Sequence, residues 1–106
     1  NKKYMYSVLE KVGLEPRSKI PVGKYSLGMR QRLAIGQAIM ENPDILILDE
    51  PMNGLDKNGV QEMRGLFEQM KNEGKLIILA SHNREDIDVL CDEVYEMENG
   101  ILKKRR

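Results

Sequence analysis

The sequence predicts one small α/β domain built on a parallel sheet, and three observations support this prediction. First, residues 45–48 and 76–80 are apolar without alternation, which is typical of strands covered on both faces. Second, residues 58–73 repeat apolar side chains at three- and four-residue steps, as an amphipathic helix does. Strands joined by such a helix pair in parallel through a right-handed crossover. Third, the 106 residues are 41% hydrophobic, enough for the core of one small domain and not of two.

The N-terminal part of the chain is predicted to be mainly helical. Residues 2–12 place apolar side chains along one stripe, and a glycine follows them as a stop signal. Residues 13–25 contain two prolines and are expected to form a loop. A second helix is predicted from Ser26, a favoured N-cap residue, to about Glu41, because the residue before Pro43 resists helical backbone angles.

The C-terminal part is predicted to end in a short helix and a hairpin. The helix covers residues 84–91, with Asn83 as its N-cap. The dipeptide Asn99-Gly100 follows between two short apolar stretches and favours a tight turn. We therefore expect two antiparallel strands at the end of the chain.

Composition narrows the possible functions. The 17 basic and 17 acidic residues balance, but the acidic ones concentrate in residues 36–100, where they repel nucleic acid. The single cysteine, Cys91, provides neither an internal disulfide nor a structural zinc site. No apolar stretch reaches the roughly 18 residues of a spanning helix, and no secretion signal opens the chain. A cytoplasmic protein that does not bind nucleic acid is expected.

Polar residues follow directly after both predicted strands. Asp49 and Glu50 come after the first strand, and Ser81 and His82 after the second. Because ligands of open α/β sheets bind beyond the carboxyl ends of the strands, we expect both pairs to face one site. Two adjacent carboxylates beside an apolar strand need a cation or hydrogen-bond donors, and Mg²⁺ meets that need. A helix cap alone would account for one carboxylate and not for both.

Four segments in order resemble the nucleotide-binding domain of ATP-binding-cassette (ABC) transporters. They are residues 25–32 (YSLGMRQR), 45–51 (ILILDEP), 53–56 (NGLD) and 81–82 (SH). Each segment alone is a weak signal, whereas the ordered set is specific. The resemblance implies a partial parallel-sheet fold of the P-loop NTPase type, with residues 1–42 as part of the helical subdomain, residues 43–106 as the C-terminal part of the ATPase core, and a C-terminal β-hairpin.

The resemblance assigns residues 26–29 to the signature segment, which meets the γ-phosphate of ATP held by the opposite subunit of a dimer. These residues are Ser26, Leu27, Gly28 and Met29. A helix beginning at Ser26 offers unpaired backbone N–H groups and the positive end of its dipole to a phosphate. Leu27 stands where the family most often has glycine, and Met29 where it often has glutamine. This variant resembles the branch that exports drugs and antimicrobial peptides. In isolation, Ser26 would be interpreted only as an N-cap.

The same resemblance implies roles for four polar residues. Asp49 matches the residue that holds Mg²⁺, and Glu50 the base that polarises the attacking water. His82 matches the histidine that contacts the γ-phosphate, although most lone histidines are buried and satisfied by backbone groups. Asp56 matches an aspartate that acts across the dimer, and it also suits the N-cap of the following helix.

The phosphate-binding loop of the family, Gly-x-x-x-x-Gly-Lys-Ser/Thr, does not occur. Neither Gly23-Lys24 nor Gly74-Lys75 has the earlier glycine or a following Ser or Thr. The chain therefore resembles the C-terminal half of a domain about twice as long.

The resemblance implies that the parent protein hydrolyses ATP with Mg²⁺ and drives export. Its expected partners are a second nucleotide-binding domain and a transmembrane permease, which hold it at the inner face of the cell membrane. Two alternatives stay open. One is a regulatory module that lends its signature helix to an intact partner. The other is a chromosome-maintenance ATPase, which is disfavoured because residues 1–24 show a proline-broken loop instead of a heptad arm.

The missing loop leads to the first prediction. Without the backbone amides and the lysine that wrap the β-phosphate, the 106-residue chain should show negligible ATPase activity. A phosphate-release assay of this chain, run beside the full-length protein, tests this. Appreciable turnover by the chain alone would contradict it.

Overall fold

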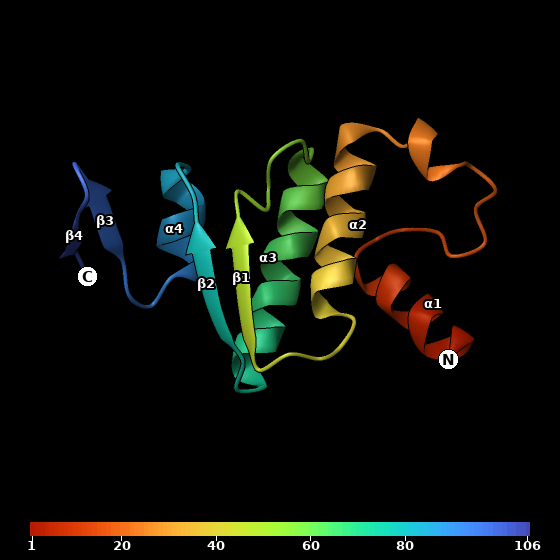
Figure 1. Cartoon of the computed structure of the whole chain (residues 1–106), viewed down its shortest axis with the longest axis horizontal. Helices are drawn as coiled ribbons and strands as arrows, with labels where there is room; N and C mark the ends of the chain where they lie inside the picture. Colours follow the sequence, from red (N-terminus) through yellow and green to blue (C-terminus); the bar gives the residue numbers. More distant parts are fainter.

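The computed structural model describes all 106 residues and confirms the α/β class. Figure 1 shows the helices and strands in sequence colours. In chain order they are α1 (Lys2–Lys11), the 3₁₀ turn η1 (Val22–Lys24), α2 (Leu27–Ile39), β1 (Ile45–Asp49), α3 (Lys57–Asn72), β2 (Leu76–Ala80), α4 (Arg84–Leu90), β3 (Tyr95–Glu98) and β4 (Ile101–Lys104).

The strands β1 and β2 form a parallel pair, as the sequence predicts. Their register runs from Ile45 opposite Leu76 to Asp49 opposite Ala80. Helix α3 connects the two strands and lies between them and α2 in Figure 1. Because the pair is parallel and in register, the residues that follow both strands emerge at the same edge of the sheet.

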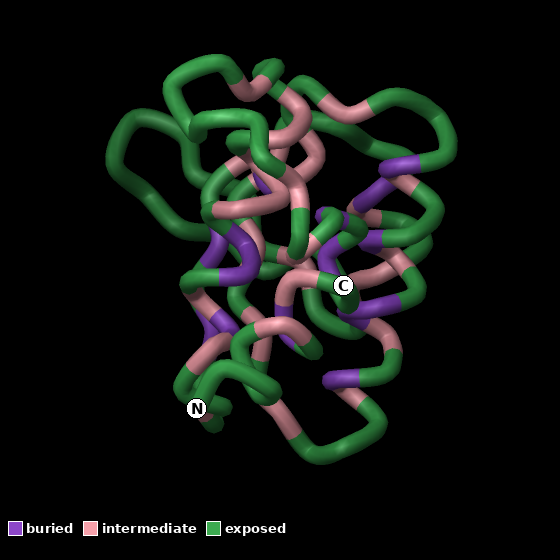
Figure 2. The backbone as a smooth tube through the Cα atoms, turned by 90° about the vertical axis from the view of Figure 1, so that its right-hand side faces the viewer, coloured by how far each residue is buried: buried purple, intermediate pink, exposed green.

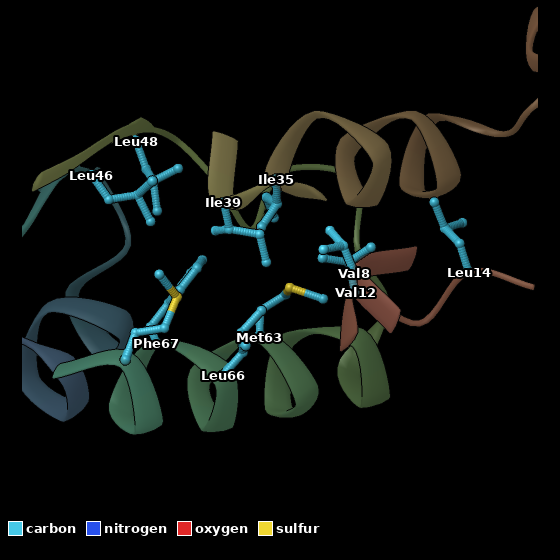
Figure 3. Close-up of a cluster of buried hydrophobic side chains, with 11 residues drawn as sticks. Val8, Val12, Leu14, Ile35, Ile39, Leu46, Leu48, Met63, Leu66 and Phe67 are labelled. Carbon is cyan, nitrogen blue, oxygen red and sulfur yellow. The ribbon is translucent and has the colours of Figure 1, made fainter. Parts of the chain in front are cut away.

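One hydrophobic core joins α1, α2, α3 and β1. Figure 3 shows the apolar side chains of α2 and β1 pointing toward those of α3. The core residues are Val8, Val12, Leu14, Ile35, Ile39, Leu46, Leu48, Met63, Leu66, Phe67 and Met70. The core therefore crosses the predicted division between residues 1–42 and 43–106, and that division into a helical subdomain and an ATPase core stays a prediction.

The expectation that both strands are buried on both faces is wrong for this chain. Leu46 and Leu48 of β1 are buried, but the alternate residues Ile45 and Ile47 are 58% and 73% exposed. The helices cover only one face of the two-stranded sheet, so every second strand residue meets solvent. Figure 2 shows buried residues as short stretches separated by exposed ones. The other apolar face of this sheet is uncovered within these 106 residues.

The helix boundaries lie within two residues of the predicted ones. Helix α2 begins after Ser26, whose Oγ accepts a hydrogen bond from the N–H of Met29 at 3.1 Å. It ends at Ile39, two residues before the expected limit, because Asn42 adopts a left-handed conformation (φ 52°) ahead of the proline. The predicted N-caps Ser26 and Asn83 are both confirmed.

The C-terminal hairpin is confirmed and stands apart from the parallel sheet. Strands β3 and β4 pair antiparallel, with Glu98 opposite Ile101. Asn99 and Gly100 both have positive φ (51° and 76°), as this turn requires. The hairpin lies at the opposite end of the molecule from α1 (Figure 1).

The chain turns sharply after β1, at Glu50, which has φ 47°. This left-handed conformation costs a residue with a side chain roughly 1–2 kcal/mol. Two hydrogen bonds hold the turn. The N–H of Glu50 donates to the carbonyl of Ala80 at 2.8 Å, and Nε2 of Gln31 donates to the carbonyl of Glu50 at 3.0 Å. The turn is thus fixed by contacts from β2 and α2.

The strained turn leads to the second prediction, on the stability of the chain. Glu50→Gly and Glu50→Ala both remove the carboxylate, but only glycine relieves the positive φ. The Gly variant should be more stable than the Ala variant by about 0.5–1 kcal/mol. At the matched control Asp49, in the extended strand, the order should reverse. Urea unfolding midpoints of the four variants measure this. If the Gly and Ala variants had the same order of stability at positions 49 and 50, the backbone strain at Glu50 would be contradicted.

Candidate functional site

The parallel sheet brings Glu50 and His82 together. The N–H of His82 donates to Oε1 of Glu50 at 2.9 Å, and Nε2 of the imidazole lies 3.7 Å from the same oxygen. The expectation that the two strand ends meet at one edge is therefore confirmed for these residues. The imidazole is fully exposed, so the alternative of a buried histidine satisfied by backbone is wrong.

Asp49 lies at the end of β1 with an exposed side chain. It borders an open hollow of about 230 Å³ between α2 and β1, whose wall also contains Gln31 and Pro51. No three acidic, histidine or cysteine side chains gather closely enough to hold a metal ion by themselves. Mg²⁺ usually takes one or two carboxylates and completes its shell with water and substrate phosphates. One exposed carboxylate at a strand end fits that pattern and does not fit a closed all-protein metal cage.

The turn that begins α2 is accessible and rests on the loop after Glu50. Ser26 is exposed, and the first N–H groups of a helix have no partner within it. A Cβ added at Gly28 would lie 2.9 Å from the carbonyl oxygen of Gly54, and one at Gly54 would lie 2.7 Å from Cγ of Leu27. Gly28 is therefore required by packing inside this chain. The accessible part of residues 26–29 is the exposed face at Ser26 and Leu27.

Asp56 caps α3. Its Oδ1 accepts a hydrogen bond from the N–H of Gly59 at 2.8 Å, and its side chain is at the surface. The N-cap role suggested by the sequence is therefore confirmed. The role across a dimer stays a prediction, and it is compatible with the cap because only one oxygen accepts the N–H.

The residues that hold this site in place are not among those predicted from the sequence. Gln31 supports the Glu50 turn, as described above. Arg32 donates to the carbonyl of Val12 at 3.1 Å and to Glu62 at 2.6 Å, so it joins the end of α1 to α3. Arg64 of α3 pairs with Asp86 of α4. These residues carry no local sequence signal, because each acts on a segment at least nineteen positions away.

Cys91 does not belong to the site. Partial burial raises the pKa of its thiol, and the nearby Asp92 and Asp86 act in the same direction. The thiol therefore stays protonated near neutral pH and is a poor nucleophile.

None of the helices combines the length and the apolar composition that a membrane-spanning helix needs.

Comparisons with known proteins identify related sequences. A sequence model described as ABC transporter matches residues 1–53. The chain is 50% identical over 95 residues to the uncharacterized ABC transporter ATP-binding protein YybJ of Bacillus subtilis (strain 168), covering 90% of this chain and 44% of that protein. It is 47% identical over 99 residues to the lantibiotic transport ATP-binding protein SrtF of Streptococcus pyogenes, covering 92% and 43%.

The fold also matches solved structures. The dimeric ATP-binding cassette MJ0796, in a post-hydrolysis state bound to ADP and Pi, superposes with a TM-score of 0.85 at 24% identity, over 98% of this chain and 47% of that chain. At this identity the match concerns the fold alone. The chain thus spans less than half the length of each of these three proteins. With half of the chain matched by the family model and close relatives over most of its length, this chain belongs to the ABC transporter family.

Proposed function

We propose that this chain is part of the ATP-hydrolysing subunit of an ABC transporter and carries the side of the site that activates water. The observation that supports this most directly is the hydrogen bond from the N–H of His82 to the Glu50 carboxylate at the ends of two parallel strands. It joins two residues 32 positions apart that the family resemblance assigns to one reaction. The similarity to ATP-binding proteins of transporters supports the same function.

In the proposed reaction Glu50 acts as the general base. Its carboxylate accepts a proton from a water molecule while the water oxygen bonds to the γ-phosphorus of ATP and the bond to the ADP oxygen breaks. The His82 N–H donates to one oxygen of the Glu50 carboxylate and so fixes its orientation, which leaves the other oxygen available to the water. The imidazole of His82, which is exposed, would donate to the γ-phosphate. Asp49 would hold Mg²⁺, which when bound offsets negative charge on the phosphates.

We propose that Ser26 and Leu27 bind the γ-phosphate held by a second nucleotide-binding domain. Exposure of this turn, and the unpaired N–H groups at the start of α2, suit a phosphate brought in from outside the chain. Asp56 lies on the loop that touches the turn through Gly54 and would act at the same dimer contact. The second partner is a transmembrane permease, which places the subunit on the cytoplasmic face of the membrane.

The transported molecule is proposed to be an antimicrobial peptide or drug, moved outward. Two features support this class. The first is the Ser-Leu-Gly-Met form of the signature segment. The second is the similarity to a lantibiotic transport protein, which covers 92% of this chain.

The third prediction tests Glu50 as the base. In the full-length subunit, Glu50→Gln should lower ATP hydrolysis by roughly 10²–10⁴-fold, because an amide cannot accept the proton. ATP binding should persist, since the amide oxygen still accepts the His82 N–H. Phosphate release and nucleotide binding are measured together. The matched control Glu98→Gln, an exposed residue of β3, should leave turnover unchanged. Parental turnover in Glu50→Gln would exclude Glu50 as the base.

The fourth prediction tests the turn at Ser26. In a Glu50→Gln background, where nucleotide is trapped, Ser26→Arg should abolish ATP-dependent dimers by filling the contact with a long charged side chain. Binding of ATP to the monomer should not change. Sizing chromatography with and without ATP measures this, with Ser7→Arg, at an exposed residue of α1, as the control for added charge. Normal dimer formation by Ser26→Arg would argue against the signature role.

A further inference from the structure

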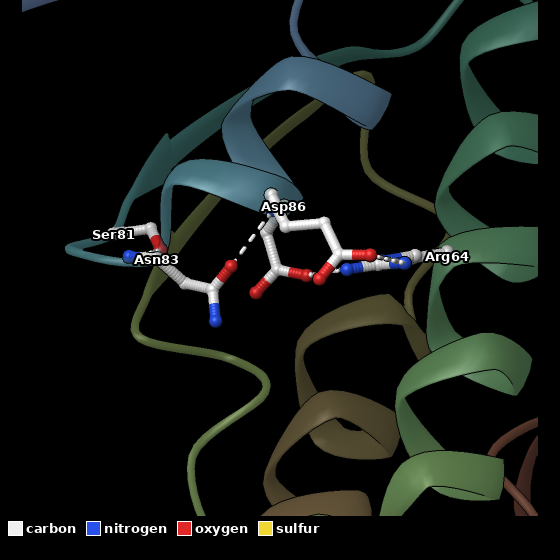
Figure 4. A network of polar contacts seen from close by, with 5 residues as sticks. Arg64, Ser81, Asn83 and Asp86 are labelled. Atoms are coloured by element: carbon white, nitrogen blue, oxygen red, sulfur yellow. Dashed lines mark hydrogen bonds and ion pairs between the residues drawn. The ribbon is translucent and has the colours of Figure 1, made fainter.

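An ion pair between α3 and α4 is the most deeply buried charge in the molecule. Asp86 is 2% exposed, and the side chain of its partner Arg64 is 11% exposed. Nε and Nη2 of Arg64 both donate to Oδ1 of Asp86, at 3.0 and 2.6 Å. Glu85 approaches Nη1 from the surface at 3.8 Å. Figure 4 shows the guanidinium reaching from α3 to the start of α4.

Such a pair is a weak source of stability. Removing two charges from water costs several kcal/mol per ion, and apolar replacements of similar volume are often neutral or stabilising. The pair is directional, however, because the planar guanidinium fixes both the distance and the angle of the carboxylate. Its physical contribution is therefore to set where α4 begins relative to α3.

The cap of α4 leaves Asp86 free to make this pair. Oδ1 of Asn83 accepts the N–H of Asp86 at 2.9 Å. In a full capping box the acidic residue at this position would accept the N–H of the N-cap residue. Here that N–H, from Asn83, goes to Oγ of Ser81 at 3.0 Å. The carboxylate of Asp86 is thus directed at Arg64.

The candidate catalytic histidine sits inside this arrangement. His82 lies between Ser81 and Asn83, and its N–H is bonded to Glu50. Residues 81–83 are held by β2, which precedes them in the chain, and by α4, which follows them. Helix α4 has only seven residues, too few to be stable without a tertiary anchor. The anchor that the structure provides within its first turn is Arg64.

We propose that Arg64 and Asp86 are a positioning pair that fixes the His82 segment so that its N–H orients the Glu50 carboxylate toward the attacking water. Neither residue touches the substrate, and both act through His82 and Glu50. The consequence for hydrolysis rests on the proposed function. The positioning of His82 itself does not, because it is a property of the folded chain.

The fifth prediction uses the double variant Arg64→Met/Asp86→Leu. It replaces the pair with apolar side chains that keep α3 and α4 packed and leave no buried charge unpaired. In the full-length subunit, kcat for ATP hydrolysis should fall about tenfold or more, because small displacements of a catalytic group are costly. KM for ATP and the thermal unfolding midpoint should stay unchanged.

A second measurement needs no ATP. In the 106-residue chain, NMR should show that the His82 amide exchanges with solvent about tenfold faster in the double variant, while amides of the β1–β2 ladder keep their rates. The matched control is the surface pair Arg105–Glu96, which is also 2.6 Å long and half exposed. Arg105→Met/Glu96→Leu should change neither His82 exchange nor kcat.

The outcomes separate this inference from the proposed function. If the parent subunit hydrolyses ATP and Glu50→Gln stops it, then parental kcat in Arg64→Met/Asp86→Leu overturns the positioning role. A fall in kcat without faster His82 exchange overturns it as well. If the parent subunit does not hydrolyse ATP, the proposed function fails, and the exchange measurement alone still decides whether the pair positions His82.

Discussion

The parallel pairing of β1 with β2 is the constraint on which the site depends. The two strands are joined by a sixteen-residue helix, so the residues that follow them are far apart in sequence. In a parallel pair their carboxyl ends meet at one edge, and the backbone of β2 even supplies the acceptor for the Glu50 N–H. A shift of one residue in the register would move Glu50 away from His82 and exchange the buried leucines of β1 with its exposed isoleucines.

The polar residues at this edge are held by contacts from the surrounding helices. Gln31 of α2 fixes the carbonyl of Glu50, and Arg64 of α3 fixes the start of α4 beside His82. Each contact comes from a helix of the core. It supports a functional residue, Glu50 or His82, that lies outside the helices and strands. The positive φ of Glu50 is strain of the kind that persists only where neighbouring contacts determine the backbone. Contacts from the packed helices thus fix the positions of residues that a loop alone would leave mobile.

Two further parts of the surface are exposed: the apolar face of the sheet and the turn at Ser26. Ile45, Ile47, Leu76 and Ile78 are about half exposed or more on the face that the helices do not cover. An exposed apolar face of this kind favours contact with other protein surface. The turn at Ser26 faces outward because its inner side is occupied by Gly54.

The amino-acid sequence alone predicts which segments form helices and strands, and which residues could carry the chemistry. Local signals sufficed there: apolar periodicity, N-cap residues, Asn99-Gly100 and polar pairs directly after apolar strands. It also suggested the family, through the order of four short segments. The expectation of strands covered on both faces was wrong, because an apolar stretch records a preference for burial and not the presence of a covering layer.

How these residues meet is seen only in the folded structure. It brought the His82 N–H to the Glu50 carboxylate, assigned Gly28 to packing against Gly54, and revealed the support from Gln31, Arg32 and Arg64. These contacts join residues that are distant in the chain, and their side chains have no preferred partner until the helices are packed. Local sequence patterns report the energetics of neighbouring residues, whereas long-range hydrogen bonds and ion pairs arise from the final arrangement of helices around the sheet.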